Sequence, residues 1–517
     1  MGALLLGDVA ATSGRVGQTR GRTEKTAAIA DLLRRAGAEE IATVTAWLSG
    51  ELPQGRIGVG WSSLRNLSRQ PPAVAAGLTV AAVDEVFTRI AAVHGPGSAG
   101  IRAGLVTELF AAATADEQHF LRGLLSGEIR QGALAGVVTD AVAAATAIPT
   151  PVVRRAVMLS GSLPATARLA VTDGADALDA LGIVVGRPLM PMLATPAASV
   201  AQAWEELGPT VVLDAKYDGA RIQVHRNGSE ISVFTRSLRD ITGAVPEVVR
   251  LVGELPCRSV ILDGETMAVT DDGRPRPFQE TMSGFGDGGT ALQPYFFDCL
   301  HLDGADLIDE PLVERLSALD AVAGGLRIPS SAVTSAAGVA ELFDAAVAAG
   351  HEGVMVKAPD GRYAAGRRGR TWQKIKPVHT VDLVVLAAEW GSGRRRGRLS
   401  NIHLGARDPD GGPPIMVGKT FKGMTDELLA WQTAVFGEHE TGRDEHTVYL
   451  RPHFVVEIAI DGVQRSTRYP GGVALRFARV VRYRPDKAPD DATSVVELRD
   501  LDRDGPTRRD RGPTRRD

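Results

Sequence analysis

The hydrophobic spacing of this chain changes near Pro188, and that change constrains the fold more than any other feature. Before it, Ala-rich and Leu-rich stretches place apolar residues at a spacing near 3.6, which is typical of amphipathic helices. After it, short β-branched runs separated by polar turns predict strands. At 517 residues the chain is long enough for about three domains, each with its own core. The sequence therefore predicts a multidomain protein that is helical first and sheet-rich afterwards.

The same patterns divide the chain into four segments. We expect an all-α domain over residues 1–186 and an α+β domain with antiparallel sheets over residues 187–379. Residues 380–496 keep the strand pattern with fewer helices, which suits a small five-stranded C-terminal β-barrel of the OB-fold type. Residues 497–517 contain GPTRRD twice, and we expect this tail to be disordered because it cannot bury apolar surface.

Composition narrows the classes of protein further. No run of eighteen or more apolar residues appears, so we expect no membrane span and no membrane partner. The two cysteines, Cys257 and Cys299, are too few for a disulfide framework or a four-cysteine zinc site, which fits a reducing cytoplasm. The net charge is −4, yet residues 362–422 hold 13 Lys and Arg against 4 Asp and Glu. This basic stretch fits either a local phosphate-binding surface or a solvated arginine-rich loop.

The segment VLDAKYDGARI at residues 212–222 contains a candidate nucleophile, Lys216. Apolar residues flank a turn at Asp218-Gly219, so the segment reads as a strand, a tight turn and a second strand. Attack on a phosphorus atom needs the neutral amine, which is scarce at neutral pH, and burial or a neighbouring cation would favour that form. A hairpin with an incidental lysine is the alternative.

Seven segments, in this order, carry a family resemblance: KYDGAR (216–221), FTRSLRDIT (234–242), LDGETMAV (262–269), YFFDCLHLDG (295–304), HEGVMVK (351–357), TWQKIKP (371–377) and RFARVVRYRPDK (476–487). Together they resemble the motifs of the covalent nucleotidyltransferases, and most closely those of the ATP-dependent DNA ligases. In the first domain, GRIGVGWSSL and FLRGLLSGEIRQGAL resemble parts of the helical DNA-binding domain of larger bacterial and archaeal ligases.

The resemblance implies a reaction. ATP would adenylylate Lys216, AMP would pass to a 5′-phosphate at a nick in duplex DNA, and the adjacent 3′-hydroxyl would displace AMP. The KxDG lysine is also found in RNA ligases and in capping guanylyltransferases, so these remain alternatives, as does an inactive DNA-binding relative. NAD-dependent ligases are excluded because they carry a four-cysteine zinc module.

The resemblance also implies site residues, each with an ordinary structural role as the alternative. Asp214 would accept a hydrogen bond from the adenine amino group, and Phe297 would stack on the base. The remaining candidates are Arg221 and Arg236 for ribose and phosphate, Glu265 for ribose or metal, Glu352 for Mg²⁺ (or Mn²⁺), and Lys357, Lys374, Lys376 and Arg370 for the phosphates.

Further residues lie outside this core. In the last motif, the resemblance implies that Arg476, Arg479, Asp486 and Lys487 orient pyrophosphate when the C-terminal domain closes, and a basic barrel edge without a catalytic role is the alternative. Arg56, Arg65 and Arg130 are candidates for DNA contacts, and solvated arginines on helices are the alternative. We expect a monomer that acts on nicked double-stranded DNA in the cytoplasm, associated with a bacterial nucleoid.

Overall fold

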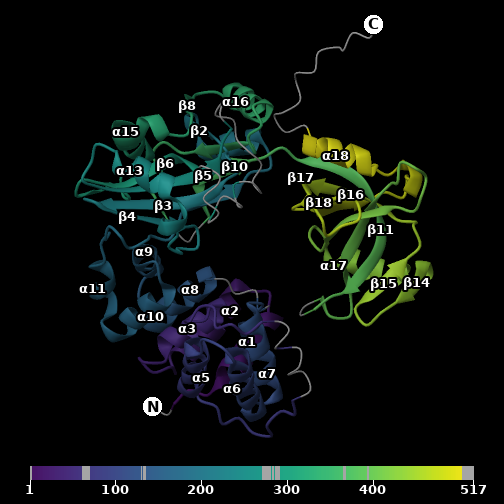
Figure 1. Cartoon of the computed structure of the whole chain (residues 1–517), viewed down its shortest axis with the longest axis horizontal. Coiled ribbons are helices and arrows are strands. Elements are labelled where there is room, and N and C mark those ends of the chain that lie inside the picture. Colours follow the sequence, from purple (N-terminus) through teal and green to yellow (C-terminus); the bar gives the residue numbers. More distant parts are fainter. Residues whose placement is uncertain are drawn as a thin grey trace.

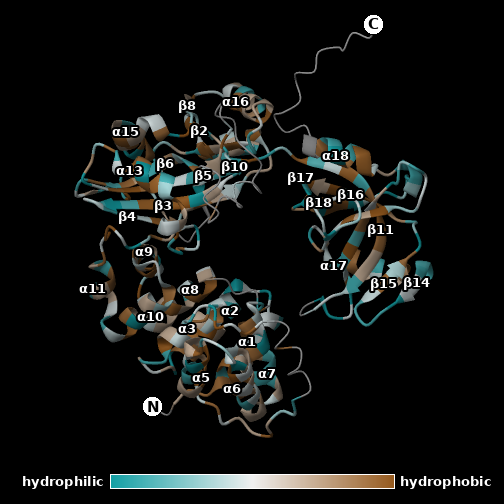
Figure 2. Ribbon diagram, viewed as in Figure 1, coloured by the Kyte–Doolittle hydropathy of each residue, from teal (hydrophilic) through white to brown (hydrophobic). Residues whose placement is uncertain are grey.

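A computed structural model describes residues 3–60, 64, 70–129, 131, 135–270, 281, 285, 292–364, 368–392 and 395–503. The chain forms three lobes that follow one another around a ring-like outline (Figure 1). Hydrophobic residues gather on the helices and strands inside each lobe (Figure 2). No helix in these ranges is long and apolar enough to cross a membrane.

The first lobe is helical, as its apolar spacing predicts. A single core holds its helices together, with Trp47, Phe87 and Phe110 fully buried. Local signals set the helix ends: Thr114 and Glu117 form a capping box, and Gly127 ends the same helix in the left-handed conformation. The helices are α1 (Leu6–Gln18), α2 (Arg22–Leu33), α3 (Ile41–Ser49), α5 (Val80–Ala92), α6 (Ser98–Ala112), α7 (Ala115–Ser126), α8 (Ala135–Thr146), α9 (Thr150–Ser160), α10 (Leu163–Thr172) and α11 (Gly174–Asp179).

The middle lobe contains two five-stranded sheets. The first has the order β1 (Leu193–Pro196), β10 (Arg368–Ile375), β9 (Val354–Lys357), β2 (Val211–Ala215), β8 (Ser330–Val333). The second has the order β4 (Glu230–Thr235), β3 (Ala220–Asn227), β5 (Ser259–Ala268), β6 (Leu292–Leu302), β7 (Ala305–Asp306). The pairings are antiparallel except for β1 with β10, which is parallel. Helices α12 (Val200–Leu207), α13 (Pro246–Gly253), α15 (Leu312–Ala323) and α16 (Ala336–Ala348) accompany the sheets.

A hydrophobic cluster joins the helical lobe to the middle lobe. Met158 and Leu159 of α9 pack there with Met192, Tyr363 and other buried residues of the middle lobe. An exposed bidentate pair between Arg155 and Asp309 lies at the same junction. Because this interface is largely apolar, we expect the two lobes to move little against each other.

The C-terminal lobe is built on a seven-stranded sheet in which the long strand β11 (His379–Trp390) pairs with three neighbours. The predicted five-stranded closed barrel is not confirmed, because the described pairings leave the sheet open. The other strands are β12 (Leu399–Ala406), β13 (Ile415–Thr420), β14 (Glu440–Arg443), β15 (Thr447–Leu450), β16 (Val455–Ile460) and β19 (Arg479–Tyr483), with a separate two-stranded arm of β17 (Gly462–Arg465) and β18 (Val473–Arg476).

The α-helices in the described part of this lobe are α17 (Asp426–Val435) and α18 (Val495–Arg503). The predicted start of the disordered tail at 497 is wrong, because α18 continues to Arg503 with Val495 and Leu498 buried in the core of the lobe. The exposed side chains of Arg20 and Asp426 form an ion pair between the helical and C-terminal lobes.

Candidate nucleotidyl-transfer site

A cavity of about 680 Å³ lies in the middle lobe, and Gln464, Leu475 and Arg476 of the β17–β18 arm also line it. Residues from both sheets line it, and most of the predicted site residues are among them. These are Asp214, Lys216, Arg221, Arg236, Glu265, Phe297, Glu352, Lys357, Lys374 and Lys376.

Lys216 lies where the chain passes from one sheet to the other. The strand before it, β2, belongs to the first sheet, whereas the strand after it, β3, belongs to the second. The segment is therefore a connection between sheets and not a hairpin. Its backbone is fixed by two hydrogen bonds, from Lys216 N–H to the Gly353 carbonyl (2.9 Å) and from Glu352 N–H to the Lys216 carbonyl (3.0 Å).

Two glycines allow this close approach of backbones. A Cβ on Gly219 would lie 2.4 Å from the Thr266 carbonyl oxygen. Gly353 has φ +136°, and a Cβ there would lie 2.1 Å from the Ile375 carbonyl oxygen. Any side chain at either position would push the lysine segment away from its neighbours.

Glu352 joins the cations of the cavity. Its carboxylate lies 2.5 Å from Lys216 Nζ, forms a second ion pair with Lys376, and lies 3.8 Å from Arg476 Nη2. Burial alone would raise the pKa of Glu352, but Lys216 and Lys376 outweigh burial and lower it. The carboxylate is therefore ionised and holds the lysine amine in place.

Asp214 and Lys357 form a buried ion pair beside Phe297. Their side chains are 3% and 1% exposed. The lysine ammonium also donates to the Phe297 carbonyl oxygen (3.2 Å) and lies 5.0 Å from the centre of the Phe297 ring. Lys357 is thus engaged by Asp214 and Phe297. The other carboxylate oxygen of Asp214, Oδ1, is buried and has no hydrogen-bond partner among the described residues.

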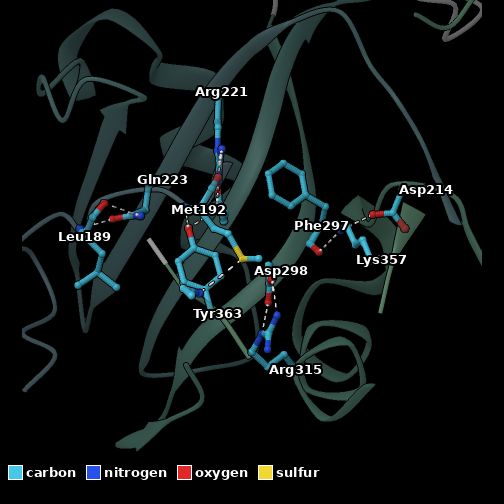
Figure 3. A network of polar contacts seen from close by, with 12 residues as sticks. Leu189, Met192, Asp214, Arg221, Gln223, Phe297, Asp298, Arg315, Lys357 and Tyr363 are labelled. Carbon is cyan, nitrogen blue, oxygen red and sulfur yellow. Dashed lines mark hydrogen bonds and ion pairs between the residues drawn. The ribbon is translucent and has the colours of Figure 1, made fainter. Parts of the chain in front are cut away.

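Arg221 lies on the side of the Phe297 ring opposite to Lys357 (Figure 3). Its guanidinium donates to both carboxylate oxygens of Asp263 (3.0 and 2.7 Å) and to the Met192 carbonyl (2.6 Å). Tyr363 supports this arrangement by donating its hydroxyl to Asp263 (2.7 Å). Burial opposes the charge on Arg221, but Asp263 outweighs it and raises the arginine pKa.

Glu265 contributes a second glutamate carboxyl group to the cavity. Burial raises its pKa to about 7, although Lys216 and Arg221 act in the opposite direction. It can therefore change charge near neutral pH, whereas Glu352 stays ionised.

The β17–β18 arm brings the last motif to the cavity through Arg476 and Phe477. Arg476 donates to both carboxylate oxygens of Asp218, at 2.8 and 3.3 Å. Phe477 has φ +54° and is 56% exposed, and its ring lies 5.5 Å from the Nζ atoms of both Lys376 and Lys422. The arm is thus docked on charged residues of the cavity.

The other predicted residues of that motif lie elsewhere. Arg479 pairs with Asp461 at 3.2 Å, Asp486 with Arg484 at 2.6 Å, and Lys487 with Asp382 at 2.6 Å. None of the three lines the cavity in the described structure. The predicted contact of Asp486 and Lys487 with pyrophosphate would therefore need a different orientation of the lobe.

Arg370 is a further exception, because it is exposed and is not among the described residues that line the cavity. The register of β10 against β1 shifts between Gly369 and Gln373, so the alternation that carries Trp372 and Lys374 does not extend back to it. Arg56 is exposed on the helical lobe. Arg65 and Arg130 lie outside the described residues.

Several residues of the site were missed by sequence reasoning. Asp263 stands inside the quoted segment LDGETMAV, so its alternation with Glu265 could have marked it. Trp372 likewise stands inside the quoted segment TWQKIKP, where it alternates with Lys374. Tyr363 and Asp461 carry no comparable signal, since each reaches the site from outside the quoted segments.

A divalent cation fits this donor set only in part. No group of three or more His, Cys, Asp or Glu side chains in the described ranges could hold a metal ion alone. Glu352 and Glu265 both face the cavity, and Mg²⁺ is usually held by one or two carboxylates together with substrate phosphates. The two glutamates fit a metal that is shared with a nucleotide.

Comparisons with known proteins agree with this geometry. Three family models match the chain: "DNA ligase N terminus" at residues 65–143, "ATP dependent DNA ligase domain" at 191–376 and "ATP dependent DNA ligase C terminal region" at 395–487. A "Probable DNA ligase" of Rhodococcus opacus (strain B4) is 60% identical over 501 residues, covering 96% of this chain and 99% of the relative.

A second "Probable DNA ligase", from Nocardia farcinica (strain IFM 10152), is 59% identical over 522 residues, covering 96% of this chain and 100% of the relative. A solved structure described as "Pmar-Lig_PreS3" has a TM-score of 0.62 at 18% identity, covering 92% of this chain and 99% of that one. At that identity the likeness concerns the fold alone.

Proposed function

Since the chain belongs to the ATP-dependent DNA ligase family, we propose that it seals nicks in duplex DNA through AMP linked covalently to Lys216. One observation carries the proposal. The single lysine that follows β2 reaches the cavity at the junction of the two sheets, with its amine 2.5 Å from a carboxylate that is itself paired with Lys376.

The first step is attack of the Lys216 amine on the α-phosphorus of ATP. The new N–P bond replaces the bond to the bridging oxygen, and pyrophosphate leaves with that oxygen. Glu352 is close enough to accept a proton from the amine. Lys374 and Lys376 line the same cavity and supply positive charge for the phosphates.

Nucleotide recognition follows from the buried groups. The unpaired Oδ1 of Asp214 suits the amino group of adenine, whereas guanine would present a carbonyl to the carboxylate. Phe297, which is partly exposed and lines the cavity, would stack on the base, and the remaining donors of Arg221 and Arg236 would reach ribose and phosphate. Mg²⁺, with Mn²⁺ as an alternative, would be held by Glu352 and Glu265 together with the phosphates, where it would neutralise developing charge.

The second and third steps use DNA. AMP passes from Lys216 to the 5′-phosphate of the nick, and the 3′-hydroxyl then attacks that phosphate and releases AMP. The ring-like arrangement of the three lobes is consistent with a monomer that encircles the duplex (Figure 1). In this proposal residues 1–186 bind DNA, residues 187–379 transfer AMP, and residues 380–496 act as an OB-type module.

The last motif supports two orientations of the C-terminal lobe. In the present one, Arg476 contacts Asp218 while Asp486 and Lys487 pair within their own lobe. We infer that the lobe turns these two residues toward pyrophosphate during the first step and presents Arg476 and Phe477 during the later ones.

Sealing of a labelled, singly nicked DNA duplex by the full chain with ATP and Mg²⁺ tests the proposal, with Glu352→Gln as a variant. We expect sealing by the wild type and its loss in the variant. Nicks with an RNA strand, run in parallel, distinguish an RNA ligase. Covalent GMP from GTP, without covalent AMP from ATP and without sealing of either substrate, would indicate a capping-type enzyme. No covalent nucleotide and no sealing would indicate an inactive DNA-binding relative.

A further inference from the structure

Three aromatic side chains lie together beside the lysine that the proposed function places at the centre of the reaction. The rings of Tyr217 and His351 are stacked, with centroids 4.7 Å apart and an interplanar angle of 15°. Tyr295 meets Tyr217 edge to face, with centroids 5.0 Å apart at 81°. All three are partly exposed.

Each aromatic residue is a direct neighbour of one charged residue of the cavity, either along the chain or across paired strands. Tyr217 follows Lys216 in the chain, and His351 precedes Glu352. Tyr295 is the direct cross-strand partner of Glu265 in the β5–β6 ladder. Each ring therefore belongs to a residue that is next to Lys216, Glu352 or Glu265 in the chain or across the strand ladder.

The cluster also spans the junction of the two sheets. His351 lies just before β9 of the first sheet, whereas Tyr295 lies on β6 of the second. Tyr217 stands in the connection between them and touches both rings. The ring contacts add to the backbone hydrogen bonds that hold Lys216 to Gly353 and Glu352 at this edge. A change in the spacing of the sheets here would change the distance between Lys216 and the carboxylates.

We propose that Tyr217, His351 and Tyr295 form an aromatic clamp that positions Lys216 against Glu352 and Glu265 for lysine adenylylation. The inference rests on the proposed function and deepens it. These are positioning residues, because the clamp acts on the nucleophile through the backbone and through ring contacts.

The contact described for the His351 side chain is the stacking of its ring on Tyr217. Its Nδ1 atom is buried and has no hydrogen-bond partner in the described structure. Its backbone N–H donates to the Ala346 carbonyl (2.9 Å), which fixes the start of the Glu352 segment against the end of α16. His351 does not line the cavity among the described residues, so it can be changed without removing a contact to nucleotide.

The test is single-turnover adenylylation of the full chain with α-labelled ATP and Mg²⁺. His351→Leu and Tyr217→Leu remove the rings, whereas His351→Phe and Tyr217→Phe keep them. For His351→Leu we expect the maximal rate to fall about tenfold, with the half-saturating ATP concentration changed less than about twofold. Tyr217→Leu should also slow the step, and both phenylalanine variants should stay within about twofold of wild type.

His453→Leu is the matched control, because it removes an imidazole stacked on His439 (4.1 Å, 20°) in the C-terminal lobe. It should leave the rate unchanged. A wild-type rate in both leucine variants would overturn the clamp, and so would a His351→Phe variant as slow as His351→Leu. Unchanged ATP dependence in a slow variant shows that it is folded. Failure of the wild type itself to take up label would instead refute the proposed function.

Discussion

Replacing Lys357 by methionine is expected to destabilise the middle lobe by about 3 kcal/mol, because it leaves the Asp214 carboxylate buried without its partner. The structure sets this magnitude: the two side chains are 1% and 3% exposed, so water cannot take the place of the lost ammonium. Asp214→Asn should cost a similar amount, since it leaves the ammonium facing only the Phe297 carbonyl and two aromatic rings. The double variant removes both charges and should cost about 3 kcal/mol, where additivity would give about 6 kcal/mol.

The chain offers a local probe for this measurement. It contains two cysteines, and Cys299 is fully buried in the core of the middle lobe. In a Cys257→Ser background, the reaction of Cys299 with a thiol reagent across a urea series reports the opening of this lobe alone. Additive effects of the two changes, or single effects below about 1 kcal/mol, would refute the assignment of a coupled buried pair.

Three further predictions concern Glu265, the docked arm and Tyr363. Burial raises the pKa of Glu265 from its ordinary 4.5 to about 7, so between these values the folded chain keeps a proton that the unfolded chain has lost. The free energy of unfolding, measured relative to that of Glu265→Gln, should therefore be highest below pH 4.5 and should fall as the pH rises through 7. Urea unfolding of both proteins without Mg²⁺ at several pH values checks this. Arg476→Asp should open the chain in small-angle X-ray scattering, and adding Asp218→Arg should restore the compact form, while unfolding free energies change by no more than about 1 kcal/mol because the pair is partly exposed. Tyr363→Phe should destabilise the middle lobe by about 1–3 kcal/mol in the Cys299 assay, since it takes a hydrogen bond from the buried Asp263.

Much of the site could be predicted because short segments carry it. Side chains two residues apart along a strand point to the same face, so Asp214 and Lys216 were expected together, as were Lys374 and Lys376. All four line the same cavity. The same alternation separates Phe297, which lines the cavity, from Phe296, which is fully buried. These relations hold within a few residues of sequence, so pattern alone reveals them.

Contacts between distant segments could not be predicted in this way. The strand, turn and strand around Lys216 give no sign that the two strands pair in different sheets. The pair between Arg476 and Asp218 joins residues 258 apart in sequence. Arg370 was expected in the cavity, but an irregularity in the β10 register, which depends on the pairing with β1, moves it out.

The C-terminal lobe illustrates the same limit. Its strands were expected from their β-branched runs, but the sequence of β11 does not reveal that it pairs with β12, β15 and β16. The end of the lobe was placed too early because charged residues dominate α18, although Val495 and Leu498 of this helix are buried.

Covalent attachment of AMP to Lys216 is the most direct test of the account. The full chain is incubated with α-labelled ATP and Mg²⁺ in the absence of DNA, denatured, and digested for identification of the labelled peptide, with Lys216→Ala in parallel. We expect label on the wild type alone, on the peptide that contains Lys216. Label on Lys216→Ala, or on a different peptide of the wild type, would contradict the assignment of this lysine as the nucleophile.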